Sequence, residues 1–197
     1  SSDFVISGPG RIGQVPFEGA FRTKLGKNSG TATVRGWVEL SERFINEFRI
    51  GLPSGSVAGA GKANVEIGLS KGKNPTFSLT SNLSGLALSL PPLGWSMSKA
   101  ASGTLQVAGR LDTPPQIESL TFDGPGLSAN GKVKLGADGQ LEVANFARVR
   151  AGSWLDARVD LVGRGAGRDP AVRVTAGTID LRKTAIGGGG SSGPSSK

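Results

Sequence analysis

Residues 85–112 read GLALSLPPLGWSMSKAASGTLQVAGRLD, with an alternating stretch on either side of a Pro-Pro-Leu-Gly-Trp corner. In the second stretch, Leu105, Val107 and Leu111 share one phase, while Gln106 and Arg110 occupy the other. Successive side chains of an extended backbone point to opposite faces of a sheet. The stretch therefore predicts two β-strands that turn at the corner, each with an apolar and a polar face.

The same alternation recurs along most of the chain. Segments rich in Gly, Asp, Asn and Pro separate the alternating runs, and these residues favour tight turns. Further strands are predicted at residues 17–25, 31–40, 56–69, 76–83, 117–122, 127–135, 140–149, 155–162 and 172–181. A short apolar run at 4–7 is expected to end at the turn signal Gly8-Pro9-Gly10. Sustained alternation at hairpin spacing predicts an all-β antiparallel meander.

One segment has a helical period. In residues 41–48, SERFINEF, the apolar residues Phe44, Ile45 and Phe48 fall on one helix face. Ser41 is suited to the N-cap, and Glu42 places a carboxylate in the first turn. The sequence predicts this as the single helix of the chain, and we expect its three Trp residues, at positions 37, 95 and 154, to be core anchors.

Length and composition fit one β-rich domain. The 197 residues are 37% apolar, and the 32 Gly and 11 Pro fall mostly between the apolar runs. We assign residues 1–186 to a single domain, a fragment of a longer protein. Residues 187–197 read GGGGSSGPSSK, and this composition predicts a flexible linker, which we interpret as a native loop.

Several kinds of site are disfavoured by the sequence. The chain has no Cys and no His, which removes thiolate ligands, disulfides and the commonest general base. We therefore expect no metal, no cofactor and no catalytic residue. Residues 8–13 match G-x-G-x-x-G. A nucleotide site needs a helix after this motif, but a strand is predicted to follow it here. Ser96 and Lys99 match S-x-x-K without the companion motifs of that chemistry, and are predicted to be loop residues.

Charge does not indicate a particular partner. The net charge is +8, but Lys and Arg are scattered along the polar phase of the strands, as on solvated faces. There is no Tyr, and the Phe residues lie mainly in the apolar phase, so we expect no nucleic-acid binding. No apolar run is long enough to span a membrane, and no signal peptide is recognisable in the printed chain.

The apolar phase of the strands must be covered by something. The sheet could fold on itself as a closed β-sandwich, or remain an elongated, curved sheet whose groove accepts acyl chains. The residues expected to face either a core or a lipid are Leu86, Leu88, Leu90, Leu105, Val107, Leu111, Val133, Leu135, Leu141, Val143, Val159, Leu161, Val172, Val174, Ile179 and Leu181.

Parts of the sequence resemble a known family. They are residues 83–96, the run GTLQVAGRLDTPPQIESLTFDGPGLSANGKVKL at 103–135, FARVR at 146–150, WLDA at 154–157, and VRVTAGTIDLRK at 172–183. They resemble the AsmA-like C-terminal region of large alphaproteobacterial envelope proteins of the YhdP and TamB type. The resemblance covers the chain from about residue 56 onward and rests on strand patterns.

The resemblance implies a function as well as a fold. It implies a periplasmic β-groove that holds or conducts phospholipid or another acyl-chain lipid, anchored to the inner membrane by a helix outside this chain. The full-length protein would then serve both the inner and outer membranes. Two alternatives are a closed sandwich acting as a structural or protein-interaction module, and a hydrolase that uses Ser96 and Lys99.

Overall fold

The computed structural model describes residues 2–25, 30–48, 50, 52, 54–165, 168–180 and 182. These residues contain one α-helix, α1 (Glu42–Glu47), and one 3-10 turn, η1 (Pro91–Leu93). The strands among them are β1 (Ser2–Ile12), β2 (Val15–Leu25), β3 (Thr31–Ser41), β4 (Val57–Ser70), β5 (Lys73–Ser81), β6 (Leu86–Leu90), β7 (Trp95–Met97), β8 (Thr104–Arg110), β9 (Gln116–Gly124), β10 (Leu127–Leu135), β11 (Leu141–Ala151), β12 (Leu155–Val162) and β13 (Ala171–Ile179).

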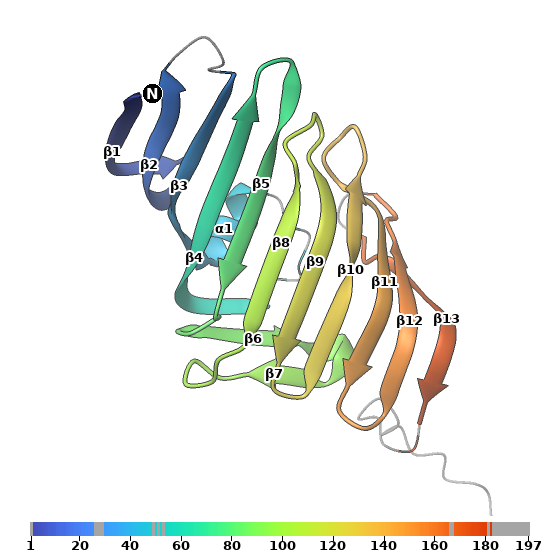
Figure 1. The fold of residues 1–197 in the computed structure, drawn as a ribbon. Helices are drawn as coiled ribbons and strands as arrows, with labels where there is room; N and C mark the ends of the chain where they lie inside the picture. Colours follow the sequence, from blue (N-terminus) through green and yellow to red (C-terminus); the bar gives the residue numbers. More distant parts are fainter. Residues whose placement is uncertain are drawn as a thin grey trace, which may run out of the picture.

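The strands form a single antiparallel meander (Figure 1). The path runs β1-β2-β3-β4-β5-β8-β9-β10-β11-β12-β13, and β6 and β7 lie off it. The sheet is neither closed nor strongly curled, so the all-β fold with one short helix is confirmed. The closed sandwich considered from the sequence does not form within the described residues.

The N-terminal strand is longer than its sequence suggests. Gly8-Pro9-Gly10 was expected to be a turn, but β1 runs through these residues, and Gly8 pairs with Gly19. This expectation was wrong because β1 is an edge strand of the described sheet. Proline has no N–H group to donate to a neighbouring strand. An inner strand pairs on both sides and would lose a hydrogen bond, whereas an edge strand can direct the proline nitrogen to its unpaired side.

The stretch that contains the Pro-Pro corner leaves the main sheet. Residues 57–59 of β4 pair with β6, and β6 pairs with β7, while β5 pairs directly with β8. We call β6, η1 and β7 the cover hairpin. It runs across the lower ends of β8, β9 and β10 in Figure 1. Ser96, predicted to be a loop residue, therefore lies in a strand, whereas Lys99 lies in a turn as predicted.

The cover hairpin contributes much of the core. Leu86, Trp95 and Met97 are buried with residues of the sheet. The Trp95 ring packs edge-on against Phe122, with ring centroids 5.6 Å apart. Its indole Nε1 donates a 2.6 Å hydrogen bond to the Pro125 carbonyl oxygen. The predicted role of Trp95 as a core anchor is confirmed.

The predicted helix is present beside the other part of the core. Phe44 and Ile45 of α1 pack against the buried cluster that includes Val15, Val38 and Leu40. Ser41 stands at the N-cap with an extended backbone, but its side chain makes no capping hydrogen bond. Packing of the apolar helix face therefore stabilises α1 more than its cap does.

Trp37 does not anchor the core. It lies on the polar face of β3, where its Nε1 donates a 3.1 Å hydrogen bond to Glu18 Oε2. The ammonium nitrogen of Lys62 lies 4.3 Å from the centroid of its ring. This expectation was wrong because Trp37 has the opposite phase to the buried residue Val38, which follows it in β3.

Candidate apolar binding face

The apolar phase of the strands continues across the whole sheet. Residues directly opposite one another in an antiparallel pair share a face, so the pairing register can be followed from strand to strand. One such line joins residues of eleven strands, and we call it the outer row. Its members are Ile6, Phe21, Val34, Ile67, Phe77, Gly109, Ile117, Val133, Ala144, Leu161 and Val172.

The outer row is not covered by another element. Its two ends are exposed, with Ile6 at 58% and Val172 at 65% relative accessibility. Most of the members between them are half-buried. Two members are exceptions: Ala144 is buried, at 3% relative accessibility, and Leu161 packs on the buried hydrophobic cluster. The other described members neither belong to that cluster nor pack on it. With strands 4.7–4.9 Å apart, the row forms an apolar strip about 50 Å long.

A glycine interrupts the row without breaking it. Gly109 of β8 pairs with Phe77 and Ile117. A Cβ placed on Gly109 would lie 3.0 Å from the Cε1 atom of Phe77, so the Phe77 ring leans over the glycine. The aromatic ring thus supplies the apolar surface that the glycine lacks.

The cover hairpin and α1 close the other side of the same face. A second line beside the outer row, the inner row, contains Val65, Leu79, Val107, Phe146 and Val159, all of which belong to the core or pack on it. Beyond the inner row lie the cover hairpin and α1. The face is therefore divided along its length into a covered part and an open strip.

The structure distributes the sequence-predicted site residues over four environments. Leu86 and Val159 are buried in the core. Half-buried residues packed on the core are Leu88, Leu90, Leu105, Val107 and Leu161. Half-buried residues of the open part are Val133, Leu135 and Leu141. Exposed residues are Leu111, Val172, Val174 and Ile179. Leu181 lies outside the described residues.

Val143 lies on the opposite face from the one its sequence phase suggests. Leu141 pairs with Leu135, but Val143 pairs with Lys134 on one side and with Val162 on the other. The register shifts between Lys134 and Leu135, because β11 carries an extra residue at that point. A bulge of this kind reverses the phase of the residues that follow it.

Several members of the outer row were not among the predicted site residues. Phe21, Val34, Ile67, Phe77 and Ile117 all come from segments recognised as strands. The signal that could have found them is the alternation itself, applied to each of these strands. Which of them remain uncovered depends on where the cover hairpin lies, and alternation carries no information about that.

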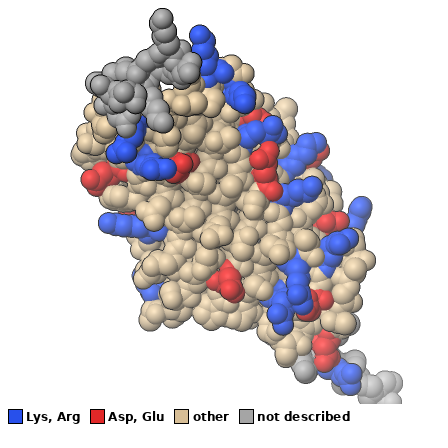
Figure 2. All heavy atoms as spheres, in the orientation of Figure 1, with Lys and Arg blue, Asp and Glu red and all other residues tan. Residues whose placement is uncertain are grey.

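The opposite face of the sheet carries the charged residues (Figure 2). Lys or Arg side chains lie beside Asp or Glu in many places, and ion pairs join neighbouring strands, such as Arg35 to Glu66 at 2.6 Å. A broad uncharged area separates two charged zones.

Asp156 of β12 is the best-partnered carboxylate on this face. Arg148 donates to both of its oxygens, at 2.8 and 2.7 Å, and Arg150 Nε lies 3.5 Å from Oδ2. The hydrogen bonds from Arg148 and the positive charge of both arginines lower the pKa of Asp156, against a smaller opposing effect of desolvation. These contacts hold β11 and β12 together on the solvent side.

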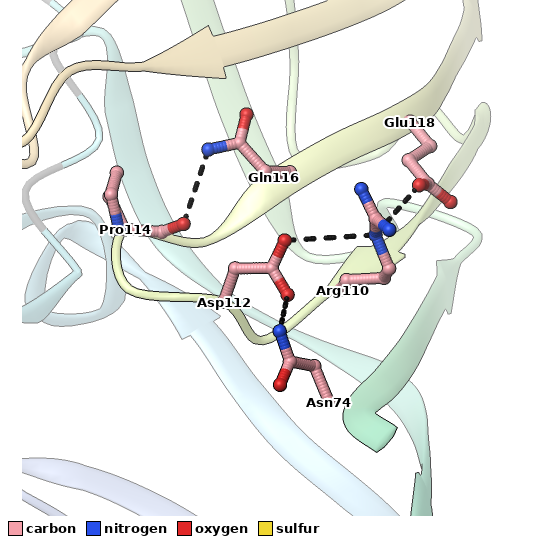
Figure 3. A network of polar contacts seen from close by, with 6 residues as sticks. All are labelled: Asn74, Arg110, Asp112, Pro114, Gln116 and Glu118. Carbon is pink, nitrogen blue, oxygen red and sulfur yellow. Dashed lines mark hydrogen bonds and ion pairs between the residues drawn. The ribbon is translucent and has the colours of Figure 1, made fainter. Parts of the chain in front are cut away.

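A second polar network joins β5, β8 and β9 near their ends (Figure 3). Arg110 Nε lies 2.9 Å from Glu118 Oε1 and 3.7 Å from Asp112 Oδ2. Asp112 also accepts a 2.7 Å hydrogen bond from Asn74 Nδ2. The carboxylate of Glu118 is therefore neutralised by Arg110.

The chain was compared with models of protein families, with curated proteins and with solved structures, and no match was found. Within the described ranges, no group of three or more acidic, Cys or His side chains could hold a metal ion. In the same part of the chain, no helix has the length and apolarity needed to cross a membrane.

Proposed function

We propose that the chain binds the acyl chains of phospholipid or of another lipid along the open apolar strip, without catalysing a reaction. The observation that carries this proposal is the outer row, an apolar line that crosses eleven strands and lies outside the hydrophobic core except at Ala144 and Leu161. Covering apolar surface is worth about 25 cal/mol per Å². An acyl chain that covers about 300 Å² would gain about 7 kcal/mol from this term.

The shape of the strip suits an extended ligand. It is long in the direction across the strands, and the cover hairpin and α1 border it on one side. An acyl chain is linear and needs no hydrogen-bond partners. The outer row is likewise linear, and its side chains have no hydrogen-bonding groups. The resemblance to AsmA-like envelope proteins supports the same proposal. It adds a periplasmic location, an inner-membrane anchor elsewhere in the full-length protein, and a role in outer-membrane maintenance.

Lipid capture by the purified protein tests the proposal. Lipids extracted from protein purified without detergent are identified by mass spectrometry, and binding of a fluorescent phospholipid is titrated. We expect Phe77→Glu, in the outer row, to abolish both signals. Its matched control is Ser78→Glu, which places the same charge on the opposite, exposed face of β5. Circular dichroism establishes that both variants fold.

The outcome that overturns the proposal is equally definite. Absence of copurified lipid together with absence of phospholipid binding would exclude it, as would equal binding by the Phe77 and Ser78 variants. Photo-crosslinking sharpens the result. A photoreactive residue at Ile117 should capture lipid, whereas the same residue at Ser119, on the polar face, should not.

A protein-interaction module is the second candidate, and the exposed edge of the sheet favours it. Val172 and Val174 lie on β13, and one side of that strand has no partner among the described residues. A partner protein could add a strand there and extend its own apolar face over the outer row. A partner captured by the lipid-free protein, and lost on Phe77→Glu without any bound lipid, would favour this candidate.

A further inference from the structure

The polar face carries an irregularity that recurs in alternate strands. Relative to a neighbouring strand, β9, β11 and β13 each have an extra residue, at Glu118, Ala147 and Thr175 respectively, and the one in β11 is separate from its bulge opposite Lys134 and Leu135. Each register shift falls at a similar height in the sheet. A bulge bends its strand and redirects a side chain, and bulges are frequent beside binding sites. Three bulges at one height therefore form a local concavity.

The three extra residues line one cavity. It has a volume of about 670 Å³ and opens on the polar face, opposite the lipid strip proposed above. Pockets for small molecules have volumes of roughly 300–1,000 Å³, so the cavity can hold a molecule larger than a free ion. The intervening strands β10 and β12 contribute Lys132 and Arg158, one from each.

In the described part of the chain, Lys132 and Arg158 make no ion pair in the cavity, although the carboxylate of Asp160 is also part of its lining. Glu118 is paired with Arg110, as Figure 3 shows, and Asp160 accepts a 2.9 Å hydrogen bond from Asn145 Nδ2. Within the described residues, Lys132 and Arg158 make no ion pair or side-chain hydrogen bond. On this face most other cations of β8, β10 and β11 are paired across strands, for example Lys134 with Glu142 at 2.7 Å.

We propose that this cavity binds a phosphorylated small molecule of about the size of a hexose phosphate. The phosphate would lie between Lys132 and Arg158, whose strands are about 9–10 Å apart with one strand between them. The planar guanidinium of Arg158 can bind two phosphate oxygens, and Lys132 adds a compact positive charge. Asn145 and Thr175 supply neutral groups for the hydroxyls of the ligand.

The site is independent of the proposed lipid strip. A β-sheet separates the two faces, so one lipid cannot place its acyl chains on the outer row and its headgroup in the cavity. The shared chemistry is a phosphate group, and its source can be a phosphorylated sugar, free phosphate or a membrane headgroup. The experiment therefore compares glucose 6-phosphate, glucose, inorganic phosphate and phosphatidylglycerol vesicles.

Isothermal titration calorimetry at low salt tests the site. We expect saturable binding of glucose 6-phosphate and none of glucose. Lys132→Gln and Arg158→Gln should each weaken binding by about tenfold or more, since each removes a charge-assisted contact. The matched control is Arg22→Gln, which removes the same charge from an exposed arginine of β2 on the same face, far from the cavity.

Three results separate the outcomes. Equal weakening by Arg22→Gln and by the two cavity variants would overturn the proposal, because binding would then reflect the net charge alone. Absence of saturable binding by all four probes would also overturn it. Inorganic phosphate or vesicles binding as tightly as glucose 6-phosphate, and losing affinity in the cavity variants only, would support the phosphate site and assign its source. Lipid copurification should be unchanged in all these variants.

Discussion

At the scale of single residues, Asp156 shows how the polar face contributes to stability. Its carboxylate joins β11 and β12 through Arg148 and Arg150, while the facing apolar residues of the same strands are buried. The group is solvent-exposed, so its contribution is smaller than the geometry of two hydrogen bonds would suggest. The effect of pH on this residue is nevertheless definite in sign.

We predict that the contribution of Asp156 to stability disappears in acid. Its pKa in the folded protein is lowered from the ordinary 3.8, chiefly by the hydrogen bonds from Arg148. The stabilisation is therefore present above the unfolded pKa of about 3.9 and is lost as the pH falls through the lower folded pKa. Urea unfolding of the wild type and of Asp156→Asn should differ at pH 7, and the difference should shrink as the pH is lowered below the ordinary pKa of 3.8. A difference that stays constant as the pH is lowered would contradict this.

Trp95 provides a prediction about the core. Trp95→Ala should lower the free energy of unfolding by about 3–5 kcal/mol, because it leaves a cavity between the cover hairpin and the sheet. Trp95→Phe keeps most of the packing against Phe122 but loses the hydrogen bond to Pro125, which is worth about 0.5–1.5 kcal/mol. Denaturant unfolding measures both. Similar losses for the two variants would show that the hydrogen bond, and not the packing, dominates.

Single residues also mark the limit of prediction from the sequence. Trp95 and Trp37 both follow a glycine, yet one is buried and the other lies among charged side chains. Position relative to the alternation separates them, because Trp37 has the polar phase of β3. Val143 could not be placed in the same way. The bulge before it depends on how β10 and β11 pair, and a local pattern contains no signal for that pairing.

At the scale of elements, β4 has to serve two structures. Its first residues pair with the cover hairpin, and residues 60–70 pair with β3 in the main sheet. Gly59, at the junction, has a φ of +82°, and Gly85 on the adjoining segment has a φ of +84°. A Cβ at either position would meet a backbone oxygen of the other segment. The junction thus requires glycine for both its conformation and its close approach.

Substitution at this junction gives the third prediction. Gly59→Ala should destabilise the protein by more than the roughly 1–2 kcal/mol that a left-handed conformation costs a non-glycine residue. Gly55→Ala is the matched control, because Gly55 has a φ of +80° but no atom within contact distance of the added methyl group. We expect Gly55→Ala to cost only the conformational term. Equal unfolding free energies for the two variants would show that the close approach is unimportant.

Most elements could be predicted from the sequence, but their grouping could not. Alternation located the strands from β2 to β13 except β7, and the change of period located α1. The same alternation is present in β6 and β8, although one crosses the face of the sheet and the other belongs to it. The direction taken after residue 83 depends on contacts with distant residues, among them Trp95 with Pro125. The open part of the apolar face could not be predicted for the same reason, because the position of the cover hairpin determines which apolar residues remain uncovered.

At the scale of the whole molecule, the two outermost described strands differ in how well they resist association. β1 contains a proline, which blunts an edge. All the residues of β13 are exposed, and it presents Val172, Val174 and Ile179 on the apolar face. An edge of that kind is a template for pairing with another chain.

The fourth prediction concerns this edge. In the absence of lipid, the protein should associate at high concentration, and Val172→Lys should shift the equilibrium toward the monomer, since a charge on an edge strand opposes pairing. Sedimentation velocity over a range of concentrations measures the effect. Thr121→Lys, on the polar face of the inner strand β9, is the control and should leave the association unchanged. Equal monomer fractions for wild type and Val172→Lys would show that β13 does not mediate the association.

The meander topology has a mechanical consequence. Nearly every strand pairs with its neighbours in the chain, and β1 and β13 lie at opposite ends of the sheet. A force that pulls on these two strands across the sheet loads the hydrogen bonds of one strand pair at a time, so the outer strands peel off in sequence at low force. The pair β5 and β8 is the exception, because these strands are not consecutive in the chain. The two strands between them, β6 and β7, pack in the hydrophobic core and should hold this part of the sheet together. The molecule should therefore extend in small steps from both ends and resist most strongly in the middle, as a quasi-one-dimensional array does when its strongest unit is internal.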